Sequence, residues 1–165
     1  LRFLLQLVRA DFYNPLCQAI VALTNPTLRP MRRWVPSIKG LDTAAVVLLL
    51  LLQMINIWLV GLVQSGSTPL FGIMAIAVAE ILSKGLWAFT GAIIVQVILS
   101  WVAQGSYSPF ISLLHSLTEP ILGPIRNAVP PVSGLDFSPF IAILLLNVLD
   151  MIAIQPIRDV GRNFF

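Results

Sequence analysis

The feature that most constrains this chain is a set of three stretches, each about 20 residues long, that are almost free of charge. Thr43–Gln64 and Gly85–Gln104 contain no Asp, Glu, Lys or Arg, and Ser138–Gln155 contains Asp150 alone. A helix needs about 20 apolar residues to cross the hydrocarbon core of a bilayer. Each stretch therefore predicts a transmembrane helix.

The composition excludes most soluble classes of protein. Of the 165 residues, 58% are hydrophobic and 10% are charged, whereas about a quarter of a typical soluble domain is charged. So few charges argue against a soluble enzyme, a nucleic-acid-binding domain and a disordered chain. The net charge of +3 is interpreted as a signal for membrane orientation, and no nucleic-acid partner is expected.

An internal repeat gives the expected organisation. When the chain is shifted by 94 residues, 13–42 align without a gap on 107–136, and thirteen of the thirty positions are identical. The pattern predicts a tandem duplication in which each unit is a helix, a long loop and a second helix. We expect a first repeat at 1–64, a linker with a short helix at 65–83, a second repeat at 84–156 and a tail at 157–165.

The expected fold is an all-α membrane protein with a four-helix transmembrane bundle. About 20 apolar residues precede Tyr107, but only twelve precede Tyr13. We therefore expect the first transmembrane helix to be truncated in this sequence, with further residues before Leu1 in the natural protein. The alternative is a first helix that is short.

Each repeat loop is expected to form an amphipathic helical hairpin that is interfacial or re-entrant. In the first copy, Thr24 and Pro26 are expected to restart a helix and Pro30 to break it. The same residue types recur 94 positions later. The functional interpretation is binding of lipid headgroups or a partner through three arginines, and the alternative is turn chemistry with ordinary topology signals. The three arginines are Arg32, Arg33 and Arg126.

The distribution of basic residues predicts the orientation. Six lie on the side of the two repeat loops and three on the other side. Because cytoplasmic loops carry the excess of Lys and Arg, both loops are expected in the cytoplasm and both termini outside. If 70–82 also crossed the membrane, the two repeats would be inverted, but this stretch is short for a span.

Polar residues inside the predicted spans follow the repeat and predict a polar seam along the bundle axis. Arg2 and Asp150 are its only base and acid and are therefore the natural candidates for an ion pair, the alternative being a bond from Asp150 to Gln53 or Asn56. Two interpretations stay open, interhelical hydrogen bonding and a lining for ions or protons. The seam consists of Arg2, Gln6, Gln53, Asn56, Gln96, Asn147 and Asp150.

No motif for catalysis is found. The sequence lacks a P-loop, a nucleophile-elbow pattern, an H-E-x-x-H pair and a Cys/His cluster. Its one histidine, His115, and its one cysteine, Cys17, cannot build a metal cage, and Cys17 is expected to be a small buried apolar residue. We therefore predict a protein that is not an enzyme, with no metal site and no cofactor.

The doubled pattern Y-x-P…L-T-x-P-x-L-x-P-x-R…P…G-L-D resembles the YggT family of bacterial and plastid membrane proteins over essentially the whole chain. The resemblance implies a bacterial inner-membrane protein without established enzymatic activity. It also implies loose links to osmotic or salt stress, and, from plastid relatives, to assembly of membrane complexes and nucleoid distribution. From Gram-positive relatives, the resemblance implies a link to the neighbourhood of cell division.

Two functions are therefore weighed. The leading hypothesis is a non-enzymatic inner-membrane protein that binds other membrane proteins, itself or lipid, as an accessory subunit or an assembly or scaffold factor. The alternative is a small oligomeric ion channel or transporter active in the osmotic response, which the polar seam with Asp150 favours.

Overall fold

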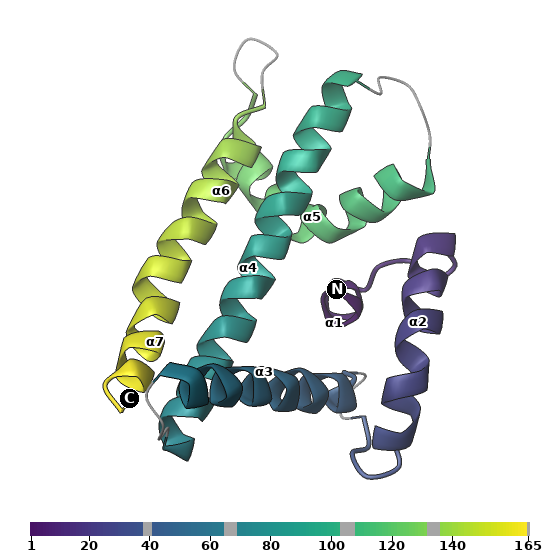
Figure 1. Ribbon diagram of the computed structural model, residues 1–165. Coiled ribbons are helices and arrows are strands. Elements are labelled where there is room, and N and C mark those ends of the chain that lie inside the picture. The colour runs from purple at the N-terminus through teal and green to yellow at the C-terminus, as the bar shows by residue number, and fades with distance from the viewer. Residues whose placement is uncertain (38–40, 65–68, 103–107, 132–135, 165) are drawn as a thin grey trace.

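Helices make up most of the residues that the computed structural model of the protein describes, which are 1–37, 41–64, 69–102, 108–131 and 136–164. Figure 1 shows the arrangement of the helices. Their bounds are α1 Arg2–Leu7, α2 Pro15–Met31, α3 Thr43–Gln64, α4 Leu70–Val102, α5 Pro109–Ala128, α6 Ser138–Leu149, a π-helical turn Asp150–Ile154, and α7 Gln155–Arg162.

Three helical segments are long and apolar enough to cross a membrane: Thr43–Val63, Leu70–Val102 and Ser138–Arg162. The prediction of an all-α protein with membrane-spanning helices is confirmed at this level. The predicted four-helix bundle is not confirmed, because the described part of the chain contains three candidate spans and its α1 has six residues. In Figure 1, α3 also crosses α4 instead of running alongside it.

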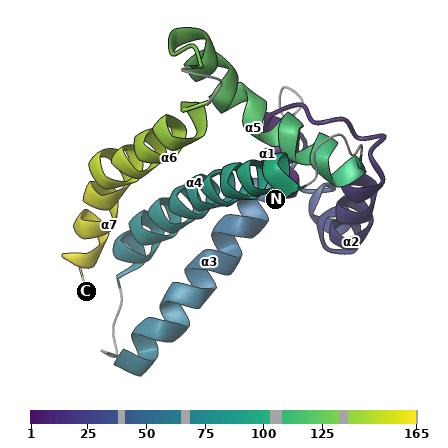
Figure 2. The same cartoon turned by 90° about the horizontal axis from the view of Figure 1, so that it is seen from above.

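Helix α4 is the centre of the fold, in contact with α3, α5, α6 and α7. It has 33 residues and is therefore about 50 Å long. The stretch expected to form a separate short helix, 70–82, continues into the third predicted span without interruption. In Figure 2 the long helices spread like a fan from α4, and α1, α2 and α5 gather at one end of them.

The last span also extends beyond its expected end. The sequence predicts an end at Pro156, but the helical path continues to Arg162 through the π-helical turn. Pro156 lies in the first turn of α7, where a missing N–H costs little. The turn before Pro156 is a wider π turn, in which hydrogen bonds join residues five apart instead of four. The N–H of Gln155 donates to the carbonyl of Asp150, five residues back.

The hairpins predicted in the repeat loops are replaced by single helices. Both α2 and α5 begin as expected, with a proline in the first turn and a capping side chain, Asn14 in α2 and Ser108 in α5. However, each helix runs through both of its internal prolines. In α2 the carbonyls that lose their helical donors belong to Ala22 and Pro26, which are exposed. Because solvent or headgroups can bond these carbonyls, Pro26 does not interrupt the helix, which ends at Met31, one residue after Pro30.

Two buried clusters hold these helices against α4. One joins α1, α2, α4 and α5, and the other joins α4, α5 and α6. Cys17 is 1% exposed in the first cluster, as the prediction of a small buried apolar residue requires. The core residues of the two clusters are Leu5, Ala10, Cys17, Ala92, Leu113, Leu114 and Leu117, and then Ile93, Leu122, Ala142 and Leu146.

Candidate functional site

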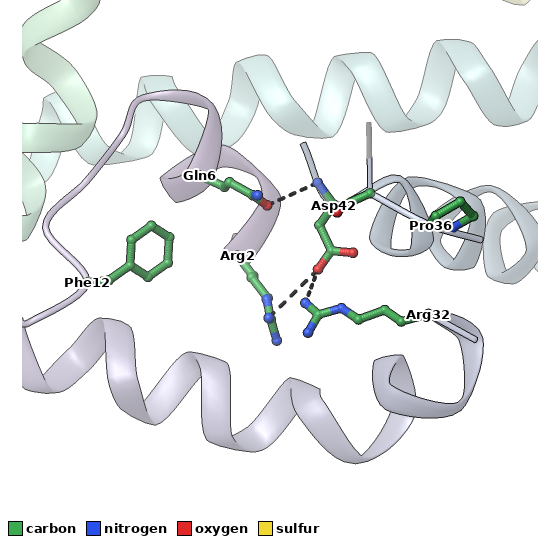
Figure 3. Close-up of a pocket in the computed structure, with 7 residues that line it drawn as sticks. Arg2, Gln6, Phe12, Arg32, Pro36 and Asp42 are labelled. Atoms are coloured by element: carbon green, nitrogen blue, oxygen red, sulfur yellow. Dashed lines mark hydrogen bonds and ion pairs between the residues drawn. The ribbon is translucent and has the colours of Figure 1, made fainter. Parts of the chain in front are cut away.

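A buried carboxylate lies at the start of α3, between two arginines. Asp42 is 3% exposed, and its Oδ2 pairs with Arg32 and, at 3.7 Å, with Nη2 of Arg2. Figure 3 shows both guanidinium groups directed at this carboxylate from different elements. The side chain of Gln6 accepts a hydrogen bond from the backbone N–H of Asp42 at 3.3 Å. The cluster therefore ties α1 and the end of α2 to the start of α3.

The electrostatics of Asp42 follow from this geometry. Burial alone raises the pKa of the carboxyl group. The hydrogen bond and charge of Arg32, the backbone N–H of Ala45 and the charge of Arg2 outweigh burial and hold the pKa below its ordinary value. The contact with Ala45, at 3.4 Å, is also an N-cap interaction for α3. The surroundings of Asp42 therefore favour its charged form.

Arg2 is held from a second side by α2. Its Nη1 donates to Oγ1 of Thr24 at 2.7 Å and to Oδ1 of Asn25 at 2.9 Å. The side chain of Arg2 is 12% exposed, whereas that of Arg32 is 42% exposed. Arg2 is thus a fixed cation inside the cluster, while Arg32 reaches the cluster from its edge.

An open pocket of about 480 Å³ lies beside this cluster. Its polar wall contains both arginines and Asp42, and Figure 3 places Phe12 and Pro36 on its sides. The full lining is Arg2, Gln6, Phe12, Arg32, Pro36, Ser37 and Asp42.

The second predicted loop carries a related but more exposed cluster. Nε of Arg126 donates to Oδ2 of Asp136 at 3.0 Å, and its Nη1 lies 3.3 Å from Oε2 of Glu119. Glu119 also lies 3.4 Å from Nε2 of His115. Burial raises the pKa of Asp136, but hydrogen bonds from Ser138 and then Arg126 outweigh it and lower the pKa below its ordinary value.

The two clusters use residues 94 positions apart. Arg32 pairs with Asp42 as Arg126 pairs with Asp136. Arg2 donates to Thr24, and at the equivalent positions Gln96 is hydrogen-bonded to Thr118. Two of the three arginines proposed from sequence are therefore engaged within the chain. Arg33 is exposed, and it makes no ion pair with any residue that the structure describes.

The residues predicted to form one polar seam lie in separate places. Gln53 accepts a hydrogen bond from Nζ of Lys84 at 2.7 Å, and Asn56 lines the same pocket between α3 and α4. Asn147 donates to the carbonyl of Ile143 in its own helix. Gln6 and Gln96 belong to the two clusters described above.

The expected ion pair between Arg2 and Asp150 is wrong, because Arg2 pairs with Asp42. Asp150 begins the π-helical turn. Its Oδ1 is buried without a hydrogen-bond partner among the described residues. It lines a cavity of about 10 Å³ with Thr90 and Asn147, a volume close to that of one water-sized probe.

Several functional contacts are not predicted from sequence. Asp42 and Asp136 end the Gly-Leu-Asp motif of each repeat copy, which by itself indicates an acidic N-cap, but not a pair with the arginine ten residues earlier. The signal is available, since an Arg and an Asp recur at the same spacing in both repeat copies. The ion pair between Nε of Arg158 and Glu80, at 3.1 Å, has no such signal, because it joins α7 to α4 in one place only.

The described residues contain no group of three or more His, Cys, Asp or Glu side chains that could hold a metal ion. What the two clusters offer chemically is fixed charge and hydrogen-bond donors close to the ends of apolar helices.

Comparison with known proteins identifies relatives over nearly the whole chain. The chain is 45% identical over 158 residues to the protein PA0392 of Pseudomonas aeruginosa, covering 94% of this chain and 80% of that protein. It is 36% identical over 164 residues to YggT of Escherichia coli K12, covering 98% of this chain and 84% of that protein. No solved structure matches.

A plastid relative covers a shorter part. The chloroplast protein CCB3 of Arabidopsis thaliana, whose full name refers to cofactor assembly of complex C, is 32% identical over 77 residues, which are 46% of this chain and 44% of that protein. The family model described as CCB3/YggT matches residues 1–63 and 75–157. The resemblance noted in the sequence is thus confirmed, and this chain belongs to the CCB3/YggT family.

Proposed function

We propose that this protein is a non-enzymatic, multi-pass protein of the bacterial inner membrane that acts as an accessory subunit or assembly factor of a membrane complex. The observation that carries this proposal is its relation to CCB3, whose name describes cofactor assembly of a complex. Its own helices support the proposal, because three are long and apolar enough to cross a membrane. The charged residues of the two recurring polar clusters pair with one another within the chain. A role in osmotic stress tolerance is part of the proposal.

The proposal includes construction from two tandem repeats. The Arg–Asp pair and the contact to a threonine hydroxyl both recur at a spacing of 94 residues. The family model also matches two segments of the chain. Because α2 and α5 lie at the same end of the long helices in Figure 2, we place both repeat loops on one side of the membrane. The excess of basic residues favours the cytoplasmic side.

We assign partner binding to the end of α2. Arg33 and Trp34 lie two and three residues beyond Met31, the last residue of this helix, and Trp34 is 88% exposed. Arg and Trp are the residue types most enriched among side chains that dominate protein interfaces. Arg32 and Arg126 are less available to a partner, because each is already paired with an aspartate of the chain. Of the three arginines proposed from sequence, Arg33 is therefore the one with the greatest freedom to meet an acidic group on a partner.

Co-purification tests this role. We expect the full-length protein, purified in mild detergent and analysed by mass spectrometry, to bring down a reproducible membrane protein. Arg33→Glu should reduce recovery of that partner about tenfold, as expected for an interface side chain worth about 1.4 kcal/mol or more. Arg162→Glu changes charge equally on the exposed end of α7 and should leave recovery unchanged. No reproducible partner, or equal loss in both variants, would contradict the proposal.

A second candidate function is a small oligomeric ion channel or transporter. One observation favours it: the buried Oδ1 of Asp150, which has no partner in the described part of the chain. Unpaired carboxyl groups within membrane-spanning helices commonly mark paths for protons or cations. The cavity beside Asp150 is small, however, and α6 and α7 continue on either side of it without a break.

Substitution of Asp150 separates the two functions. Under the accessory role we expect Asp150→Asn to fold, to melt in detergent at the same temperature as the parent or higher, and to support growth under salt stress. The reason is that an amide of the same shape avoids the cost of burying an unpaired ionisable group. Under the channel role, the variant folds but loses ion flux in liposomes. A folded Asp150→Asn protein that no longer supports growth under salt stress would therefore reject the accessory role.

A further inference from the structure

The small cavity beside Asp150 lies between two neighbouring helices. Helices α4 and α6 contact each other and run side by side in Figures 1 and 2. The cavity has a volume of about 10 Å³, and three of its lining residues are polar: Thr90 from α4, Asn147 from α6 and Asp150 from the start of the π-helical turn. The rest of the lining is apolar and consists of Leu86, Trp87 and Leu146.

The three polar side chains offer complementary hydrogen-bonding groups. Asn147 and Asp150 are three positions apart and therefore share one face of their helix, and Thr90 is 7% exposed on the helix opposite. Oδ1 of Asp150 is buried without a hydrogen-bond partner among the described residues. Asn147 uses its side-chain nitrogen for the carbonyl of Ile143, which leaves its side-chain oxygen as an acceptor. The cavity thus has two acceptor oxygens and one hydroxyl group that can donate.

Asp150 is too deep in its helix to reach bulk water. It lies twelve residues after Ser138, the first residue of the candidate span, which is about 18 Å along the helix axis. In a hydrocarbon core about 30 Å thick, a carboxyl side chain is too short to reach either surface from that depth. A polar oxygen in such a place needs a hydrogen-bond partner, because leaving it unpaired is costly.

The size and the chemistry of the cavity match one water molecule. A space of about 10–15 Å³ is the smallest that holds a water, and a buried water makes about three hydrogen bonds. Here a water can accept a hydrogen bond from the hydroxyl of Thr90 and donate to the oxygens of Asp150 and Asn147. A divalent metal ion takes about six or more oxygen ligands, and three side chains supply too few.

We propose that this cavity binds one structural water molecule, which joins Thr90 of α4 to Asn147 and Asp150 at the end of α6. The water connects the two helices through hydrogen bonds at the point where the π-helical turn begins. Asp150 then serves as part of a link between helices and not as a step in an ion path. The site goes beyond the proposed function and does not depend on the identity of any protein partner.

The sign of one substitution tests the water. Thr90→Val keeps the shape of the side chain and removes the hydroxyl. We expect its melting temperature in detergent to fall by about 3 °C, the shift that the loss of one hydrogen bond produces in a chain of this size. Without a bound water the hydroxyl has no partner in the cavity, so valine would leave the melting temperature unchanged or raise it. That result would overturn the proposal.

The control is Thr27→Val, which makes the same change at an exposed position of α2. It should shift the melting temperature by less than about 1 °C. An equal fall in both variants would mean that the loss at Thr90 is a general effect of replacing threonine by valine in this protein, and it would overturn the proposal as well.

Nuclear magnetic resonance detects the water directly. In the full chain with ¹³C-methyl-labelled leucine, we expect magnetisation transfer from water to the methyl groups of Leu146, which line the cavity. Two leucines are controls: Leu122 is 1% exposed in the same apolar cluster, and Leu144 is 52% exposed on α6 and faces detergent. Neither should receive magnetisation from water. Transfer to all three leucines, or to none, would overturn a single bound water.

A double substitution tests whether Thr90 and Asp150 act through the same water. In an Asp150→Leu background, Thr90→Val should cause no further loss of stability, because the water has already lost its carboxyl partner. An equal loss with and without the carboxyl group would show that the two residues act independently and would overturn the link. If Asp150→Leu fails to fold, the sign of the Thr90→Val change decides.

A change of salt distinguishes water from an alkali cation. We expect the parent protein to melt at the same temperature in sodium chloride and in choline chloride of equal ionic strength. A higher melting temperature in sodium that Asp150→Asn abolishes would assign the cavity to a cation and overturn the water. The accessory role is tested separately, since failure to recover any partner would reject that role and leave the water site standing.

Discussion

Replacing Asp42 by Asn should lower the free energy of unfolding by about 3 kcal/mol, at the lower end of the range for breaking a buried ion pair. Asn is as good a helix cap as Asp, so the N-cap contact with Ala45 is retained and only the charge is removed. Arg2, whose side chain is 12% exposed, then loses the carboxylate with which it is paired. Thermal or SDS-induced unfolding in detergent measures the loss.

The matched control is Asp136→Asn, 94 residues later. Asp136 also accepts a hydrogen bond at the start of its helix and pairs with an arginine. Its side chain is 38% exposed and that of Arg126 is 35% exposed. Ion pairs in such surroundings contribute about 0–1 kcal/mol. Equal destabilisation by the two substitutions would mean that burial of the first cluster does not determine its strength.

The same carboxylate predicts a dependence on acid. Because its pKa in the folded protein lies below the ordinary value of 3.8, the stabilisation from Asp42 is fully present above that value. It is lost as the pH falls through the lower pKa of the folded state. We therefore expect the melting temperature of the parent protein to fall below about pH 4, and that of Asp42→Asn to fall less steeply.

The sequence is most informative where the membrane itself dictates the structure. Uncharged stretches such as Thr43–Gln64 have few alternatives to a spanning helix, because unpaired backbone groups are too costly in hydrocarbon. The starts of α2 and α5 are also predictable, since a capping side chain followed by proline acts within one turn. These are local or solvent-imposed effects, and they need no knowledge of tertiary contacts.

Interior prolines and polar contacts are less predictable for physical reasons. Pro26 does not interrupt α2 and Pro156 does not end the last span, because exposure of the neighbouring backbone in one case and a π-helical turn in the other compensate for the missing N–H. Arg2 and Asp150 look like partners only because each is the single charge of its sign in the predicted seam. Which helix faces each of them is decided by tertiary packing, and Arg2 lies against α2 and α3.

The contact between α4 and α7 gives the other large expected effect. Gly161 lies so close to α4 that a Cβ added there would be 2.6 Å from Cγ1 of Ile76, 3.1 Å from its backbone N and 3.2 Å from Cβ of Ala75. Gly161→Ala should therefore push the two helices apart and lower the free energy of unfolding by about 1–3 kcal/mol, the usual cost of overpacking. Thermal unfolding in detergent measures this change.

Gly91→Ala is the control, because nothing lies within 4 Å of a Cβ added at Gly91 in the same central helix. Alanine has the higher helix propensity, by about 1 kcal/mol, so this variant should be as stable as the parent or slightly more stable. The opposite signs of the two changes depend on close packing of α7, since propensity alone predicts a gain at both positions. If Gly161→Ala stabilised the protein as Gly91→Ala does, α7 would not pack on α4 at this distance, and the pairing of Arg158 with Glu80 beside it would have to be reconsidered as well.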